Sequence, residues 1–506
     1  MRVGAPLRMG RRSAGNRDAG LATLALGDLV ALPTQREAPL SAPVAPRSSV
    51  RVAPRKGWRE PGAGRAAVLL RPDPHRATTA QAEGIFPFLA GSGVPPVGPV
   101  MGWDVLTRAT FSCHPVEWLL RDLVTNPNMI FTGIPGSGKS ATMKALALRL
   151  MAFGVKVLVA GDIKNEYAPL ARALGVEPVE LGVGLPARLN PLDAGPLGLD
   201  LPRDPGAARE RLDEIHRRRV TLLDTLLTMQ VGRQLLPLEK AAVSYAVRRC
   251  TGEYTGASSL ADPTIPQVWQ VLAHPDTDLA LDLGLPRADV ELAKDKLEHV
   301  RHGLGNMVEG SLGGIFDAPS TVRLDFDAPI QSVDLSRIDG RGDETVAMVM
   351  ACVSSWSQAA IDQPGGVRAV VRDEVWRSMR IPAMIRKIDS DLRLSRSQGT
   401  IQMLSTHRLS DFEQVGAAGS EEVSIARNLI ASCDTRVQLA QDTGPLAMTR
   451  EAIGLTDAEC EHIASWSAEH KGYALWKVGR ATSHIVRTAL TAPELQLFHT
   501  NERMVV

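Results

Sequence analysis

The sequence predicts an α/β fold in which helices cover a parallel, doubly wound sheet. Apolar runs of strand length alternate with segments of helical periodicity from about residue 128 onward. A glycine-rich loop joins the first of these strands to a helix, and a later apolar strand ends in two consecutive carboxylates. In sheets of this kind, the loops that follow the carboxyl ends of the strands carry the ligand-binding groups.

The composition is that of a globular chain with room for more than one domain. Of 506 residues, 44% are hydrophobic and 22% are charged. The five cysteines are scattered without a Cys-x-x-Cys pair, which argues against a disulfide framework or a zinc site and suits a reducing cytosol. No apolar run reaches the ~18 residues of a membrane span. We therefore expect a cytoplasmic location.

Residues 1–83 form a basic segment that is rich in Pro, Gly, Ala and Arg. Residues 1–82 hold 14 Lys or Arg against 5 Asp or Glu, an excess of nine positive charges, whereas the rest of the chain carries an excess of eight negative charges. Little periodicity is present, so we predict a disordered arm. Two alternatives stay open for this arm: contact with DNA or anionic lipid, and a solvated terminus without a specific partner.

Ordered structure is expected from Gly84 onward. Residues 84–127 contain short extended segments between Gly and Pro turns, which predicts a short β-rich lead-in. Asn128–Thr132 then reads as a buried strand. The next eight residues, "GIPGSGKS", satisfy the pattern G-x-x-x-x-G-K-[ST], and a helix follows with an apolar face. That face is made of Met143, Leu146, Ala147 and Leu150.

Strand, glycine loop and helix are the context that a phosphate-binding loop requires. The glycines let successive backbone N–H groups point at phosphate oxygens. Lys139 is predicted to reach the β- and γ-phosphates of a nucleotide, and the Ser140 hydroxyl to ligate Mg²⁺. The residues predicted to bind the nucleotide are Gly133, Ile134, Pro135, Gly136, Ser137, Gly138, Lys139, Ser140 and Ala141.

The alternation of strands and helices continues and is then interrupted. A continuous apolar strand ends at Asp162, a helix follows with Gly175 as its C-cap, and "VEPVEL" is a further strand. Residues 207–310 show helical periodicity and few strand signals. We predict one sheet domain, built from residues 128–206 and 311–506, with a helical insertion subdomain over residues 207–310.

The segment "VRAVVRDEVW" carries the second piece of chemistry. Its apolar strand ends in Asp373 and Glu374, beside the phosphate-binding loop. We predict that Asp373 holds the Mg²⁺ water shell and that Glu374 orients and deprotonates the attacking water. An acidic pair after a strand is by itself more often a solvated strand end, but its order after the glycine loop favours the catalytic interpretation.

A helix over Ile381–Gln398 and the strand "TIQMLSTH" complete the candidate site. Thr406 and His407 end that strand, where a polar residue can sense the γ-phosphate or simply terminate the strand. Arg393 and Arg396 precede it. In a ring ATPase, an arginine from the neighbouring subunit can complete the site in trans.

Several stretches, in this order, resemble the type IV secretion and conjugal-transfer ATPases of the VirB/TrbE/TraC type, within the HerA–FtsK superfamily. They include the Asn190-Pro191-Leu192-Asp193 element, and coverage runs from about residue 84 to the end. The stretches are "WLLRDLVTNPNMIFTGIPGSGKS", "AGDIKNEYAPLA", "ARLNPLDAG", "GSLGGIFD", "VDLS", "RDEVWRSM", "RSQGTIQMLSTHRLSDF" and "GYALWKVGRATSHIVRTALTAPELQLFHTN".

The resemblance implies a RecA-like ring motor that uses ATP and Mg²⁺, expected as a hexamer. It implies that Arg396 is the arginine finger, with Arg393 and Arg436 as alternatives. His407 stands where the family usually has a glutamine, and this departure affects the sensing chemistry because an imidazole changes charge near neutral pH. The resemblance also implies membrane secretion-channel proteins as partners and a peripheral position at the inner face of the cell membrane.

Two classes of function follow from the resemblance. The first is a motor for substrate transfer or pilus assembly, and the second is a HerA/FtsK-like DNA translocase or a conjugative coupling-type ATPase. The absence of an N-terminal membrane span and the net acidic ordered part favour the first. Only a short arm precedes the motor here, so we expect docking to be lost, reshaped or supplied by a separate protein. A degenerate, purely structural ring is disfavoured by the intact Lys139, Ser140, Asp373 and Glu374.

Overall fold

The structure is a computed structural model, and it describes residues 93–499 except 183, 199–200, 253–261, 311, 323, 362–365, 418, 467–469 and 480–481. The predicted basic arm over residues 1–83 and the start of the lead-in lie outside the described residues. In the described part, no helix combines the length and the apolar character that a membrane crossing requires.

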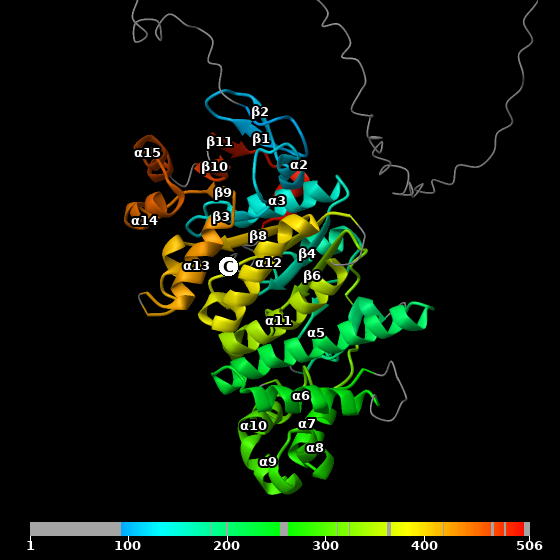
Figure 1. Cartoon of the computed structure of the whole chain (residues 1–506). Helices are drawn as coiled ribbons and strands as arrows, with labels where there is room; N and C mark the ends of the chain where they lie inside the picture. Colours follow the sequence, from blue (N-terminus) through cyan, green and yellow to red (C-terminus); the bar gives the residue numbers. More distant parts are fainter. Residues whose placement is uncertain are drawn as a thin grey trace, which may run out of the picture. The chain divides into compact units, whose positions relative to one another are not determined.

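One eleven-stranded sheet organises the described residues (Figure 1). Its strand order is β2-β1-β11-β10-β9-β3-β8-β7-β4-β6-β5. The seven strands from β9 to β5 are parallel, and the four from β10 to β2 continue the sheet with antiparallel pairing. The strands are β1 Val100–Asp104, β2 Thr110–Ser112, β3 Met129–Thr132, β4 Lys156–Asp162, β5 Val179–Glu180, β6 Ile330–Asp334, β7 Arg368–Arg372, β8 Thr400–Thr406, β9 Thr435–Gln438, β10 Tyr473–Val478 and β11 Thr482–Thr488.

Helices cover both faces of the parallel strands, because alternate strand residues carry apolar side chains to opposite sides. In β3, Met129 and Phe131 join one apolar cluster with the helices α3 and α4, whereas Ile130 joins another with α12 and α13. The helices outside the insertion are α2 Pro115–Leu120, α3 Lys139–Met151, α4 Ala168–Ala173, α11 Asp343–Ile361, α12 Pro382–Gln398, α13 Glu421–Ala431, α14 Thr443–Ile453, α15 Asp457–Ser465 and α16 Ala492–Leu497.

Six α-helices of the described residues lie between β5 and β6 and form the helical insertion that the sequence predicts. In Figure 1, α5 lies against α11, and α6 to α10 gather on its other side. Asp204 caps the start of α5, and Gly232 ends it with a φ of 74°. The helices are α5 Pro205–Val231, α6 Pro237–Cys250, α7 Ile265–Ala273, α8 Thr277–Asp282, α9 Val290–Lys296 and α10 Glu298–Glu309.

The insertion shares its core with the sheet. Leu223 and Leu226 of α5 belong to the same apolar cluster as Val346 of α11 and Val333 of β6. The described residues accordingly belong to one compact unit. The predicted division at residues 207 and 310 therefore describes a change of secondary structure within that unit, and its boundaries stay a prediction.

The lead-in extends the main sheet. β1 pairs antiparallel with β11, so that Gly102 lies opposite Thr488, and β2 pairs with β1. A Cβ on Gly102 would lie 1.9 Å from the Arg487 carbonyl oxygen, so only glycine permits this approach. The sequence shows the short strands but not this pairing, because the partner strand comes almost four hundred residues later.

Candidate active site

The candidate site lies at the carboxyl ends of three neighbouring strands, β3, β8 and β7. The glycine loop follows β3, His407 follows β8, and Asp373 and Glu374 follow β7. The acidic pair is predicted to lie beside the loop, but in the sheet β8 lies between β3 and β7. The intervening strand brings a residue of its own into the site, which the sequence did not single out.

The loop over Gly133–Gly138 has the backbone of an anion cradle. Gly136 and Gly138 take φ values of 81° and 99°, which other residues rarely adopt. A Cβ on Gly138 would lie 2.9 Å from the Gly472 nitrogen, whose N–H donates to the Ser137 carbonyl. Gly138 caps α3 without a side chain, so the free N–H groups at the helix start can bind phosphate. The loop therefore fits a nucleotide.

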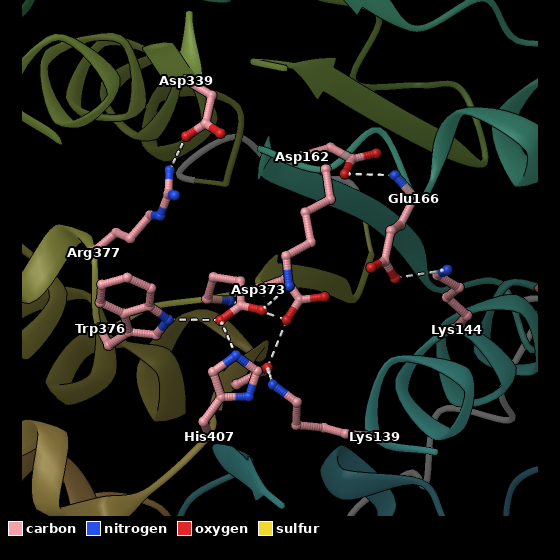
Figure 2. A network of polar contacts seen from close by, with 12 residues as sticks. Lys139, Lys144, Asp162, Glu166, Asp339, Asp373, Trp376, Arg377 and His407 are labelled. Carbon is pink, nitrogen blue, oxygen red and sulfur yellow. Dashed lines mark hydrogen bonds and ion pairs between the residues drawn. The ribbon is translucent and has the colours of Figure 1, made fainter. Parts of the chain in front are cut away.

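A hydrogen-bonded chain joins the loop to the first carboxylate. The buried Lys139 Nζ donates to Ser405 Oγ at 2.9 Å, and Ser405 Oγ donates to Asp373 Oδ1 at 2.6 Å. Figure 2 shows Lys139 and Asp373 pointing toward one another. Ser405 lies near the carboxyl end of β8, a strand whose residues are all buried. A serine at such a position is the sequence signal that could have identified it.

The predicted metal ligands fit Mg²⁺ that arrives with a nucleotide. Ser140 is the second residue of α3, half-buried, and Ala141 follows it. No group of three or more His, Cys, Asp or Glu in the described residues is arranged to hold a metal ion by itself. Magnesium usually needs only one or two protein ligands, because phosphate oxygens and water supply the others. Ser140 and Asp373 suffice for that mode.

Glu374 sits on a strained turn directly after β7. Its φ is 52°, a conformation that non-glycine residues rarely adopt and that is often found at functional sites. Both carboxylate oxygens have partners. Oε1 pairs with Lys164 Nζ, while Oε2 accepts from Trp376 Nε1 at 2.6 Å and lies 3.1 Å from His407 Nε2. Figure 2 shows Trp376 and His407 converging on this carboxylate.

These partners set the charge of Glu374. Burial by itself would raise its pKa, but the hydrogen bond from His407, the charge of Lys139 and the contact with Lys164 together hold the pKa well below its usual range. Burial lowers the pKa of Lys164, yet Glu374, Glu166 and Asp373 outweigh it and raise that pKa. The pair is therefore ionised at neutral pH.

The turn that carries Lys164 is fixed by the end of β4. The Asp162 carboxylate accepts the backbone N–H groups of Glu166 at 2.8 Å and Tyr167 at 2.6 Å. Burial, with a smaller contribution from Asp334, raises the pKa of Asp162 to about 6. Glu166 in turn pairs with the buried Lys144 at 3.0 Å (Figure 2). Lys164 is visible in the sequence as a charged residue just after a buried strand. Its partner Glu374 lies 210 residues later, so the pairing is not visible.

A cavity of about 420 Å³ opens beside the loop and leads to the partners of Glu374. Trp376 and His407 line it, and Arg380 and Arg408 add positive charge. Its further lining residues are Ile134, Pro135, Asp411, Gln414 and Val415. The site therefore has room for a group next to the glycine loop.

Thr406, the other predicted sensor residue, does not line this cavity. It is buried and donates to Asp411 at 2.8 Å, so it supports the loop after β8.

The structure does not bring the candidate finger arginines to this site. Arg396 lies in the last turn of α12, near the amino ends of the parallel strands, where it donates to the Thr125 carbonyl at 3.1 Å. Arg393 is exposed and pairs with Asp389 at 2.8 Å. Arg436 lies within β9, between β3 and β10, and is half-buried. Of the three, Arg396 has the exposure and the terminal position that a contact with another subunit requires.

The fold and the glycine loop are those of the P-loop class of proteins. No family model matches the chain, and no curated protein does. The structure of VirB4 of Thermoanaerobacter pseudethanolicus superposes with a TM-score of 0.62 at 18% identity, over 80% of this chain and 100% of that one. The plasmid coupling protein TrwB, in complex with the ATP analogue ADPNP and with ADP and Mg²⁺, gives a TM-score of 0.49 in both cases, at 13% and 12% identity, over 78% of this chain and 91% of TrwB.

The similarity to VirB4 establishes the fold. It confirms the predicted RecA-like P-loop sheet with a helical insertion, and at the level of the fold it confirms the resemblance to the VirB type. At 18% identity it shows the fold alone, and the similarity to TrwB, with a TM-score below 0.5, carries no argument.

Proposed function

We propose that this chain is an ATP-hydrolysing motor of a type IV secretion or conjugal-transfer system, which couples Mg-ATP hydrolysis in a ring to substrate transfer or pilus assembly. The observation that carries the proposal is the chain from Lys139 through Ser405 to Asp373, with Glu374 adjacent, on a fold shared with VirB4. These residues come from α3, from β8 and from the turn after β7, so their convergence is a property of the fold.

Each residue has a role that follows from its position. Lys139 supplies a point charge for the β- and γ-phosphates, and the start of α3 supplies N–H donors. Ser140 and Asp373 would hold Mg²⁺, which when bound neutralises charge on the phosphate oxygens. Glu374 orients the attacking water and accepts its proton. Ser405 positions Lys139 and Asp373, and His407 contacts Glu374, where it can sense the state of the site.

The proposal includes assembly and location. A homo-oligomeric, hexameric ring would let the exposed Arg396 of one subunit reach the nucleotide of the next. Membrane secretion-channel proteins would be the partners, so we propose a cytoplasmic protein that is peripheral at the inner face of the membrane. The proposal includes contact of the basic arm with DNA, as binding that does not by itself stimulate ATP hydrolysis.

The replacement Lys139→Ala tests the nucleotide site. We expect it to remove most nucleotide affinity and all turnover, because the Lys139 charge is the main cation on the phosphates. Binding of a fluorescent ATP analogue and phosphate release are the measurements. The control is Lys240→Ala, because Lys240 lies in α6 and pairs with Asp224 at 2.9 Å, away from the site. Wild-type ATP affinity in Lys139→Ala would show that the loop does not bind ATP.

A second experiment separates the two motor classes. The ATPase rate of the wild-type chain is measured alone, with double-stranded DNA, with single-stranded DNA and with membrane fractions. The secretion motor predicts stimulation by membrane fractions and little response to DNA. Strong stimulation by DNA would instead identify a translocase or coupling-type ATPase with the same catalytic residues.

A further inference from the structure

The acidic pair after β7 is buried and needs compensating positive charge. Asp373 and Glu374 are 8% and 6% exposed. Uncompensated carboxylates at such positions are strongly unfavourable. The described structure compensates them with two lysines that come from different elements, Lys139 from α3 and Lys164 from the turn after β4.

These two lysines differ in how firmly they are held. Lys139 is 5% exposed and hydrogen-bonded to Ser405 within the sheet edge. The Lys164 side chain is 54% exposed and reaches Glu374 from a surface turn, whose next residue, Asn165, has a φ of 56°. A half-exposed lysine can leave its partner for water with little loss, whereas a buried one cannot.

Lys164 also occupies the oxygen of Glu374 that would otherwise be free. Oε2 already contacts Trp376 and His407, and Lys164 takes an acceptor position of Oε1, so the lysine competes with a water molecule for that oxygen. A general base must lie within hydrogen-bond reach of the proton that it abstracts. In this arrangement Trp376 and His407 orient the Glu374 carboxylate, but the ion pair with Lys164 hinders its contact with a water molecule.

We propose that Lys164 is a latch on Glu374: its ion pair with Oε1 keeps the carboxylate from activating water until Lys164 moves away. This inference rests on the proposed ATPase function and deepens it by naming a positioning residue that regulates the base. Lys164 is not a catalytic residue, because it acts through Glu374.

The charges around Lys164 indicate what opens the latch. The ammonium of Lys164 is attracted by the carboxylates of Asp373 and Glu166 as well as by that of Glu374. If Asp373 holds Mg²⁺ when a nucleotide binds, the added positive charge would weaken the attraction between Lys164 and the acidic pair. Because Lys164 is half exposed, it can then turn toward solvent or Glu166, and Oε1 becomes available to water.

The first test replaces Lys164 in the full-length chain. Lys164→Met removes the charge and retains an apolar stem, and we expect basal turnover at pH 7.5 to rise on the order of threefold to tenfold because Oε1 is freed. Lys164→Arg keeps the cation, so we expect its turnover to stay near that of the wild type. Lys240→Met is the matched control for loss of an exposed, paired lysine. A fall of Lys164→Met toward the activity of Glu374→Gln would overturn the latch.

The division of the effect between kcat and KM separates the latch from a structural role. Lys164 contacts Glu374 and lies on the turn after β4, away from the glycine loop. Lys164→Met should therefore raise kcat and leave the KM for Mg-ATP near that of the wild type, and Lys164→Arg should change neither. A changed KM with an unchanged kcat in Lys164→Met would overturn the proposal.

A third readout does not depend on turnover. Amine acylation of Lys164, followed by mass spectrometry, reports whether its ammonium is held by Glu374. We expect faster acylation in Glu374→Gln than in the wild type without nucleotide, and equal rates would overturn the latch. A wild-type chain that neither binds nor hydrolyses Mg-ATP would instead refute the proposed function, and the acylation result would still report on the ion pair.

Discussion

The two edges of the parallel strands carry their charged side chains in opposite ways. At the carboxyl edge, Lys139 and Glu374 are 5% and 6% exposed and belong to one connected set of hydrogen bonds and ion pairs. At the amino edge, Arg396 is exposed, and the described residues provide one partner for it, the backbone carbonyl of Thr125. The contacts at the carboxyl edge fix Lys139 and Glu374 in place, whereas the contact at the amino edge leaves the Arg396 guanidinium free to move.

This difference bears on the proposed ring. The carboxyl edge provides a phosphate cradle, a lysine and two carboxylates, and a cation from a second copy would add to the positive charge of Arg380 and Arg408 as charge develops during hydrolysis. A guanidinium has five N–H donors, and a single carbonyl contact leaves most of them available to a second molecule. We therefore propose that the amino edge of one copy faces the carboxyl edge of the next.

A buried ion pair connects the two edges within one chain. Arg372, the last residue of β7, precedes the acidic pair, and its guanidinium lies 2.6 Å from Asp391 of α12, the helix that ends near Arg396. Both side chains are 3% exposed. Ser354 of α11 and Gln402 of β8 also bond to Arg372. The helix that carries Arg396 is thereby attached to the strand that carries Glu374.

The replacement Arg396→Ala should have the largest effect on turnover. We expect near-normal ATP binding and a loss of turnover on the order of 10³–10⁵, the usual contribution of an arginine finger. Mixing provides the decisive measurement: rings that contain both Arg396→Ala and Glu374→Gln subunits should regain partial activity, because an intact Arg396 then meets an intact Glu374. No recovery in rings shown to be mixed would count against action in trans.

Glu374→Gln should have the next largest effect, at the opposite edge. The amide keeps the shape and the contact with Trp376 but removes the base, so we expect ATP binding to persist and turnover to fall on the order of 10²–10⁴. Single-turnover phosphate release and nucleotide titration are the measurements. Turnover within about threefold of the wild type would exclude Glu374 as the base, given that expected range.

Asp391→Leu should disturb the link between the edges and act mainly on stability. It leaves the Arg372 charge buried without a carboxylate, which we expect to lower the free energy of unfolding by about 3–5 kcal/mol. Urea unfolding gives this value. The double replacement Arg372→Met with Asp391→Leu removes both charges and should recover a large part of the loss. If the double variant is no more stable than Asp391→Leu, the unpaired charge is not the cause.

Arg393→Ala should have the smallest effect. Arg393 lies one turn before Arg396 on α12 and pairs with Asp389 at 2.8 Å on an exposed helix face. Such a pair contributes about 0.3–0.5 kcal/mol, so we expect stability and turnover close to those of the wild type. Loss of turnover in Arg393→Ala, with Arg396→Ala active, would assign the finger to the other arginine.

The local elements of the site could be predicted from the sequence because their signals lie within short segments. β3, the glycine loop and α3 follow one another in the chain, as do β7 and the acidic pair, and β8 and His407. Their strand ends and helix starts depend on glycine conformation and on apolar periodicity, which neighbouring residues determine. The length of β5 was harder to predict, since only Val179 and Glu180 pair with β6.

The contacts between these elements could not be predicted in the same way. Ser405 meets Lys139 across 266 positions of the chain, and Lys164 meets Glu374 across 210. Such contacts depend on the order of strands in the sheet, and the sequence alone did not show that β8 lies between β3 and β7. The same holds for β1, which pairs with β11 at the far end of the chain.

The sequence by itself therefore determined which residues can carry the chemistry: a loop that curls around phosphate, a lysine, a serine and two carboxylates at strand ends. The tertiary structure decided which of them touch. It placed Ser405 between Lys139 and Asp373, gave Glu374 a lysine partner, and sent Arg396 to the opposite edge. The physical reason is that backbone conformation and apolar pattern act over a few residues, whereas ion pairs at a sheet edge depend on how distant segments pack.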